Sequence, residues 1–140
     1  MISLRQSEPS DAELLLQVWR DAVDDSHDFL SAEDRRAIDP LVADYVATAS
    51  LLVAIVDGAP AAFMGVSGRN IDSLFIDPRL QGCGIGRMMI EQVALPATVE
   101  VNEQNARAVA FYRHMGFEIV GRSETDGEGR PYPLLHLRRD

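Results

Sequence analysis

A glycine-rich stretch sets the strongest limit on how this chain folds. QGCGIG, at residues 81–86, comes two residues after an apolar strand-like run, SLFIDP, and places three glycines at alternate positions. Glycine lets the backbone approach a ligand closely, and the start of a helix presents unpaired N–H groups to an anion. A strand, this loop and a helix over 85–95 therefore predict a phosphate-binding turn. Glycine-rich strand-to-helix turns also occur for purely structural reasons, so the loop alone leaves both readings open.

Two common phosphate-binding loops do not fit this stretch. A Walker loop ends in Gly-Lys-Ser/Thr, whereas this one ends in Gly-Arg-Met at 86–88. The dinucleotide fingerprint needs a glycine where Arg87 stands, and it opens a parallel βαβ unit near the N-terminus. Here an antiparallel hairpin of residues 51–56 and 60–67, turning at Asp57-Gly58, comes first. What remains is a strand, the glycine loop and a helix, where a pyrophosphate would lie on backbone N–H groups without a side-chain cation, or where the loop is an ordinary glycine-rich turn.

Helix start signals and apolar spacing predict two helices in the first part of the chain. One begins with a capping box at Ser10–Glu13 and continues with apolar residues at helical spacing from 14 to 22. A second capping pattern, Ser31–Asp34, opens another helix, which we expect Pro40 to break or restart. Period-two patterns and turn signals predict strands at residues 2–5, 51–56, 60–67, 70–76, 97–101, 117–122 and 132–138.

The order of these elements predicts the fold class. Asn105 is a plausible N-cap for a further helix, which Gly116 ends in the left-handed conformation. The 140 residues suit one domain, spanning 1–140. We predict an α/β (α+β) domain with a mixed, mostly antiparallel sheet of about six to seven strands, flanked by about four helices.

Composition excludes several classes of function. The chain is 46% hydrophobic and 25% charged, as in soluble globular proteins. A formal net charge of −9 disfavours nucleic acid as a partner and favours cationic substrates. No signal peptide and no apolar run of membrane-spanning length are apparent, and Cys83 is the single cysteine. We therefore expect a cytoplasmic protein without membrane partners, disulfide or metal site.

The glycine loop resembles a known signature. Gln81-x-x-Gly84-x-Gly86 matches the (Arg/Gln)-x-x-Gly-x-(Gly/Ala) pattern of the GNAT superfamily of N-acetyltransferases. The family's other landmark, an Asn followed by an aromatic pair and Gly-Phe, reads NEQNARAVAFYRHMGF here. The stretches AVDDSHDFLSAED, LFIDPRLQGCGIG and GRSETDGEGRPYPLLHL also resemble the YjaB-type bacterial acetyltransferases of this family. The likeness keeps the same order and covers nearly the whole chain.

The resemblance implies a GNAT fold and direct transfer of an acetyl group from acetyl-CoA to a primary amine of a small molecule or protein, with no metal. In the family, backbone groups of the strand before the loop hold the pantetheine arm and polarise the acetyl carbonyl, and the loop holds the pyrophosphate. The cofactor-binding residues implied by the resemblance are Leu74, Phe75, Ile76, Gln81, Gly82, Cys83, Gly84, Ile85, Gly86, Arg87, Asn105 and Tyr112.

Tyr112 is the catalytic residue that the resemblance implies. It occupies the family's tyrosine position before Gly-Phe, and a phenol with a pKa near 10 stays protonated at neutral pH and can protonate a leaving thiolate. It also shares an apolar helix face with Phe111 and Met115, so a plain core role is the alternative.

Candidates for the acceptor side are His27, Phe29, Asp72 and Glu100. His27 and Phe29 follow the first helix, where the family builds its acceptor pocket. Asp72 and Glu100 lie on the strands that flank the cofactor, where the resemblance makes each a candidate general base. Each has a structural alternative: a helix cap or loop residue for His27, core for Phe29, and solvated strand positions for the carboxylates. A substrate amine that arrives partly neutral needs no dedicated base.

Two other functions stay open at this point. One is a non-catalytic module that binds or senses acyl-CoA. The complete glycine loop and the presence of Tyr112 disfavour this function. The other is a toxin-type enzyme acetylating aminoacyl-tRNA, which the acidic charge disfavours. The apolar segment GRPYPLL is expected to supply an exposed strand for pairing of two copies as a homodimer.

Overall fold

The computed structural model describes residues 1–26 and 28–140. The strands among these residues are β1 (Ile2–Gln6), β2 (Leu52–Val56), β3 (Ala59–Ser67), β4 (Asn70–Ile76), β5 (Ala97–Asn102), β6 (Glu118–Ser123) and β7 (Leu134–Arg139). The helices are α1 (Ala12–Ser26), α2 (Ala32–Thr48), α3 (Ile85–Ile90) and α4 (Ala106–His114), with short 3₁₀ helices η1 (Pro9–Asp11) and η2 (Pro78–Leu80).

The described strands form a mixed sheet of hydrogen-bonded order β1-β2-β3-β4-β5-β7-β6. The pairs β1–β2, β2–β3, β5–β7 and β6–β7 are antiparallel, and β4–β5 is parallel. These findings confirm the predicted α/β class with a mostly antiparallel sheet.

The chain divides into two compact units, each built from two stretches of sequence. The first unit comprises residues 1–65 and 73–92, and the second comprises residues 66–72 and 93–140. Strands β3 and β4 each contribute residues to both units.

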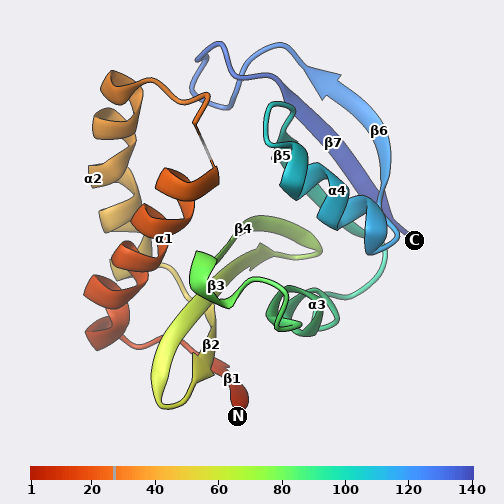
Figure 1. Ribbon diagram of the computed structural model, residues 1–140. Helices are drawn as coiled ribbons and strands as arrows, with labels where there is room; N and C mark the ends of the chain where they lie inside the picture. The colour runs from red at the N-terminus through yellow and green to blue at the C-terminus, as the bar shows by residue number, and fades with distance from the viewer. Residues whose placement is uncertain (27) are drawn as a thin grey trace. The chain divides into compact units, whose positions relative to one another are not determined.

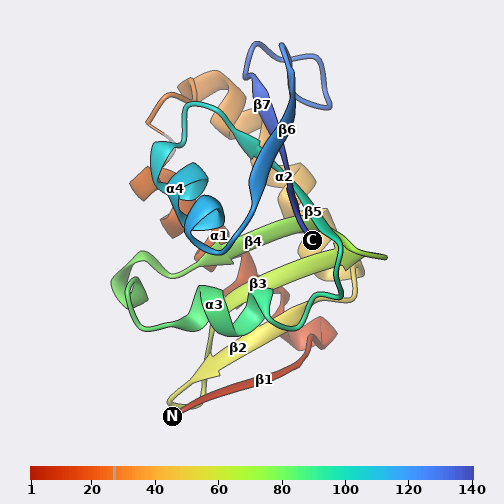
Figure 2. The same cartoon turned by 90° about the vertical axis from the view of Figure 1, so that its right-hand side faces the viewer.

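In the first unit, β1, β2 and most of β3 are neighbouring antiparallel strands (Figure 2). The predicted β2–β3 hairpin is confirmed. It turns at Asp57 and Gly58, whose φ angles of 50° and 85° are those of a type I′ turn. Helices α1 and α2 lie side by side (Figure 1) and contribute to a buried apolar cluster. That cluster consists of Leu15, Val18, Trp19, Val23, Val46, Leu51, Val53 and Phe63.

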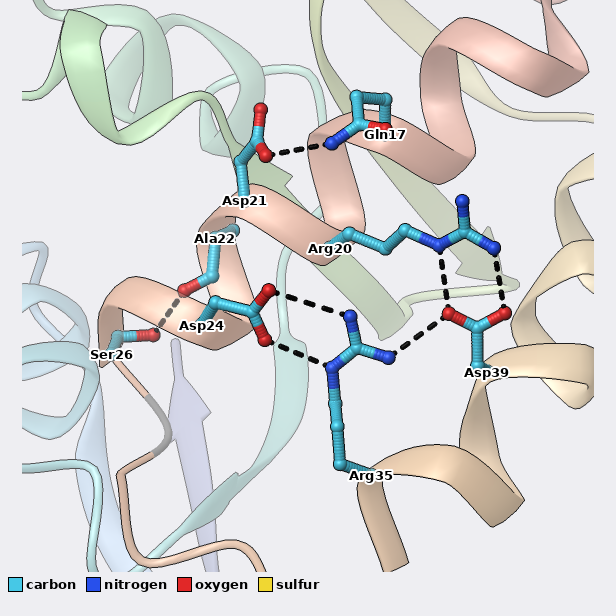
Figure 3. A network of polar contacts seen from close by, with 8 residues as sticks. All are labelled: Gln17, Arg20, Asp21, Ala22, Asp24, Ser26, Arg35 and Asp39. Atoms are coloured by element: carbon cyan, nitrogen blue, oxygen red, sulfur yellow. Dashed lines mark hydrogen bonds and ion pairs between the residues drawn. The ribbon is translucent and has the colours of Figure 1, made fainter. Parts of the chain in front are cut away.

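A chain of ion pairs joins α1 to α2 (Figure 3). Arg20 of α1 holds both carboxylate oxygens of Asp39 on α2, at 2.8 and 2.9 Å. Arg35 of α2 donates to Asp39 at 2.9 Å and to Asp24 of α1 at 2.9 Å. The Arg35 guanidinium also lies over the Trp19 ring, 4.7 Å from its centroid. The two helices are thus tied by charge outside the core and by apolar packing within it.

The start of the first helix differs from prediction. The capping box is formed by Glu8 and Asp11 around η1, not by Ser10 and Glu13. Asp11 accepts a hydrogen bond from the Glu8 backbone N–H at 2.8 Å, and Arg5 binds both oxygens of the same carboxylate at 2.7 and 2.9 Å. Because Arg5 fixes the Asp11 carboxylate, the helical turn begins earlier than the local pattern indicates.

Helix α2 does not break at Pro40, contrary to prediction. The predicted cap is present, since Ser31 accepts from the Asp34 N–H at 3.1 Å, but the helix then continues through Pro40 to Thr48. The ion pairs of Arg35 and Asp39 hold the turn before the proline, and Val46 holds the second half in the core. Tertiary contacts therefore outweigh the hydrogen bond that proline removes.

In the second unit, β7 lies between β5 and β6, and α4 packs against β5. The expected exposed strand at GRPYPLL is therefore wrong. Leu134 and Leu135 pair with β5 on one side and with β6 on the other, so this segment offers no free edge. The homodimer stays a prediction without that argument.

Candidate functional site

The glycine loop follows a turn that Asp77 builds. Asp77 ends β4, accepts from the Arg79 N–H at 3.0 Å, and is bound by the Arg79 guanidinium at 3.0 and 2.7 Å. Its own N–H donates to the Ala61 carbonyl at 2.8 Å, which fixes the turn to β3. The Arg79 guanidinium holds the pKa of the Asp77 carboxyl below its ordinary value. The Asp-Pro pair is the sequence signal for this turn, but the pairing of Asp77 with Arg79 was not predicted.

The loop itself is exposed and has the conformation that only glycine adopts without strain. Gly82 and Gly84 have φ angles of 81° and 82°, and no heavy atom lies within 4 Å of where a Cβ would stand at either one. Gly84 is the N-cap of α3, and Gln81 to Gly84 face solvent. The loop thus leaves open space beside its backbone, as a cradle for an anion requires.

Helix α3 is shorter than predicted. It runs from Ile85 to Ile90 rather than to residue 95, and Glu91 is its C-cap. Ile85 and Gly86 are buried, whereas Arg87 is exposed. Burial of the first turn anchors the loop to the first unit.

The strand segment before the loop belongs to the same unit. Leu74, Phe75 and Ile76 are half-buried at the end of β4. The Phe75 ring lies against Phe63, with centroids 5.5 Å apart, so the core fixes this segment.

In the second unit, Asn105 is the N-cap of α4, as predicted. It is 8% exposed, and its Oδ1 accepts from the Ala108 N–H at 3.1 Å. Gly116 ends the helix with a φ of 96°, which confirms the predicted terminator. Since Oδ1 is engaged by the helix, a ligand would meet the amide N–H₂ of Asn105 as a donor.

Tyr112 lies one helical turn before that terminator and is buried, with 6% of its surface exposed. Its ring packs edge-to-face against Phe111 and Phe117, with centroids 5.1 and 5.4 Å apart. Burial raises the pKa of the Tyr112 phenol, because the charged form is poorly solvated there. The side chain is therefore a core residue and, at the same time, a neutral hydroxyl throughout the physiological pH range.

The predicted acceptor residues lie in different places. Asp72 is exposed, accepts from Asn70 Nδ2 at 2.8 Å and is also bonded by Ser67 Oγ. Glu100 is exposed on β5, opposite His136 of β7, with 3.8 Å between its Oε2 and the Nδ1 of that histidine. Phe29 is half-buried in the segment that connects α1 to α2, and His27 lies outside the described residues.

The structure brings the predicted residues together in two sets, one in each unit. The end of β4, the glycine loop and the start of α3 form one continuous set in the first unit. Asn105, the N-cap of α4, and Tyr112 within α4 lie in the second unit. Asp72 and Glu100 belong to the same unit.

The described residues offer neither a cluster of metal ligands nor a membrane-spanning helix. No group of three or more His, Cys, Asp and Glu side chains is arranged there to hold a metal ion. None of the described helices is long and apolar enough to cross a membrane.

Comparison with known proteins identifies the family. A family model described as an acetyltransferase (GNAT) domain matches residues 47–119. Peptidyl-lysine N-acetyltransferase YjaB of Salmonella typhimurium is 47% identical, with 98% of this chain and 97% of the relative covered. The apo-form solution structure of YjaB from Escherichia coli has a TM-score of 0.95 and 46% identity, covering 99% of this chain and 97% of that one.

A more distant structure shares the fold. The PaiA N-acetyltransferase of Thermoplasma acidophilum, solved in complex with coenzyme A, has a TM-score of 0.73 at 17% identity, with 100% of this chain and 99% of that one covered. Together with the glycine loop and the fold described above, these matches show that the chain belongs to the GNAT family and is an acetyl-CoA-dependent acetyltransferase.

Proposed function

We propose that this protein transfers the acetyl group of acetyl-CoA to the side-chain amine of lysine in a protein or peptide. The observation that carries the proposal is the complete Gln81-x-x-Gly84-x-Gly86 loop between β4 and α3, with open space beside its backbone. The acceptor class is supported by the relatives of 46–47% identity, which are named peptidyl-lysine N-acetyltransferases. The acidic charge of −9 favours encounter with a cationic lysine-rich surface.

The glycine loop and the end of β4 would hold the acetyl donor, which supplies an activated thioester. Backbone N–H groups of the loop would take the pyrophosphate, and no side chain would crowd it at Gly82 or Gly84. Backbone groups of Phe75 and Ile76 would pair with the pantetheine arm and polarise the acetyl carbonyl. The amide N–H₂ of Asn105 would donate to the same arm.

Tyr112 would donate the proton that the departing sulfur takes up. Its raised pKa keeps the hydroxyl protonated before the reaction, and the phenolate left after transfer would take up the proton that the attacking amine loses, which would return Tyr112 to its neutral form. Asp72 and Glu100 are exposed strand residues, and Asp72 already accepts hydrogen bonds from Ser67 and Asn70. We therefore propose that the neutral fraction of the lysine amine is the nucleophile, with no dedicated base.

Calorimetric titration of acetyl-CoA tests the loop. Gly84→Glu adds a side chain and a negative charge where the pyrophosphate would lie, so we expect binding to fall at least about a hundredfold through lost contacts and charge repulsion. Gly58→Glu is the matched control, because Gly58 also has a positive φ of 85° and open space around its Cβ position, but lies in the β2–β3 turn. Equal binding by both variants would refute the phosphate loop.

Turnover with lysine peptides tests the reaction. The chain itself contains no lysine, because all 13 of its basic Lys or Arg residues are arginines, so self-acetylation of lysine adds no background. If the protein binds acetyl-CoA but transfers no acetyl group to any peptide or small amine, the result would contradict the proposal and indicate a non-catalytic acyl-CoA-binding module. Transfer to small amines alone would retain the enzyme and remove the peptidyl acceptor.

A further inference from the structure

Three groups from α2, β3 and β4 meet within the first unit, beside the strand segment assigned to the acetyl thioester. The Tyr45 hydroxyl lies 2.8 Å from Ser73 Oγ. The backbone N–H of Gly65 donates to the same Oγ at 3.0 Å. Both contacts are partly buried. One serine oxygen thus connects a helix side chain to the backbone of β3.

Gly65 provides the space for this arrangement. A Cβ at this position would lie 2.0 Å from the Tyr45 hydroxyl, 2.9 Å from Ser73 Oγ and 3.2 Å from Leu51 Cδ2. Glycine inside a strand weakens it, and a common reason for its presence is the close approach of another group. Here the approaching group is the Tyr45 hydroxyl, which occupies the space that a side chain at position 65 would fill.

Ser73 stands directly before the segment Leu74–Ile76. Side chains alternate along a strand, so Ser73 and Phe75 share one face of β4. Tyr45 and Phe75 both pack on the apolar cluster of the first unit, and Phe75 meets Phe63. The β4 backbone is therefore held from this face at two places, by a hydrogen bond at Ser73 and by ring packing at Phe75.

We propose that Tyr45 and Ser73 are a positioning pair for acetyl transfer, which fixes the β4 backbone where it orients the acetyl carbonyl. The inference rests on the proposed function. Groups that orient reacting atoms are sensitive to displacement, and a shift of about 1 Å can cost on the order of a hundredfold in rate. The hydrogen bonds of the pair join α2, β3 and β4, so its loss should affect turnover more than cofactor affinity.

Steady-state kinetics of Tyr45→Phe test the pair. We expect kcat to fall about tenfold while KM for acetyl-CoA stays within about twofold, because orientation rather than binding is lost. Thr98→Val is the control, since it removes a hydroxyl hydrogen bond of the same 2.8 Å length, to Asn70 in the second unit, and should leave kcat nearly unchanged. An unchanged kcat in Tyr45→Phe, or an equal fall in both variants, would overturn the proposal.

A second-site variant separates the pair from a general loss of packing. Gly65→Ala places a methyl group on the Tyr45 hydroxyl, and we expect a fall in kcat of more than about tenfold. Adding Tyr45→Phe removes the oxygen of closest approach and should recover part of the lost kcat, because the close contacts with Ser73 Oγ and Leu51 Cδ2 stay. A double variant that stays at or below the level of Gly65→Ala would count against the pair.

Amide hydrogen exchange in the protein without acetyl-CoA gives a readout that does not depend on activity. Tyr45→Phe should accelerate exchange at the amides of residues 73–76 by about tenfold, and Thr98→Val should not. If the wild-type protein transfers no acetyl group, the proposed function fails, yet the exchange data still decide whether Tyr45 holds β4. Unchanged exchange in Tyr45→Phe would remove the pair even if the enzyme is active.

Discussion

Tyr112 shows how one side chain serves packing and chemistry together. Tyr112→Phe keeps the ring that packs on Phe111 and Phe117 but removes the hydroxyl. We expect kcat to fall about a hundredfold, the usual contribution of a positioned acid, with little change in KM for acetyl-CoA. Steady-state kinetics with a lysine peptide would measure this effect.

The control for that variant is Tyr132→Phe, which alters another buried tyrosine that lies outside the proposed site. Its kcat should match the wild type, so equal losses in the two variants would indicate a packing effect.

The raised pKa of Tyr112 also affects the stability of the fold. Folding favours the neutral phenol, so its contribution is complete below the unfolded pKa of about 10 and is lost as the pH rises above it.

At single residues, the sequence predicts those features of the structure that depend only on residues close by in the chain. The Asn105 cap and the Gly116 terminator are local signals, and both are confirmed. The contact of Tyr45 with Ser73 joins residues 28 positions apart and depends on how α2 meets β4. The one local hint was Gly65, a glycine within an apolar strand pattern.

Among the elements, the α1–α2 pair yields a prediction about charge. Asp39 accepts hydrogen bonds from Arg20 and Arg35, which lower its pKa to about 2. We expect Asp39→Asn to reduce the free energy of unfolding by about 1 kcal/mol at neutral pH, the upper range for partly exposed ion pairs. Urea unfolding of both proteins would measure the difference.

The sign of the pH dependence follows from the lowered pKa. The carboxylate is favoured in the folded state, so its contribution is complete above the unfolded pKa of about 3.9 and fades as the pH falls through about 2. The wild type and Asp39→Asn should therefore converge in stability at acid pH. Asp24→Asn, at the exposed end of the same network, should cost less at neutral pH. A constant gap between wild type and Asp39→Asn across pH would contradict this account.

Helix α2 also shows where local rules fail. Ser31 begins the helix as its side chain predicts, because capping involves only the next three residues. Pro40 does not end it, because Arg35 and Asp39 bind α1 just before the proline. No pattern within α2 reveals those partners, so its continuation was not predictable from the sequence of the helix.

For the whole molecule, the absence of lysine from the sequence predicts that the protein does not acetylate its own side-chain amines. The amine that the structure shows is the Met1 α-amino group, which pairs with Asp57 at 3.3 Å. Intact-mass analysis after prolonged incubation with acetyl-CoA should show at most one added acetyl group, while a lysine-rich carrier protein in the same tube gains several. Multiple acetyl groups on this protein would contradict the prediction and point to hydroxyl or thiol modification.

The fold class was predictable because element order and the glycine loop are both local patterns. Strand neighbours were less so. GRPYPLL reads as an exposed apolar strand, yet β7 is central because β6 and β5 pair with its two edges. An edge strand and an internal strand differ in their pairing partners rather than in their own residues. The exposed strand on which the dimer prediction rested is therefore not present. The single domain over residues 1–140 stays a prediction.

The interleaving of the two units has a consequence for synthesis. The first unit needs residues 73–92 as well as 1–65, and the intervening stretch 66–72 belongs to the second unit. A chain growing on the ribosome therefore cannot complete the first unit until residue 92 has left the exit tunnel. The stretch 66–72 waits longer still, for the C-terminal strands. The first unit can therefore be complete before the second, but the stretch 66–72, which lies between its two parts, folds only with the C-terminal residues 93–140.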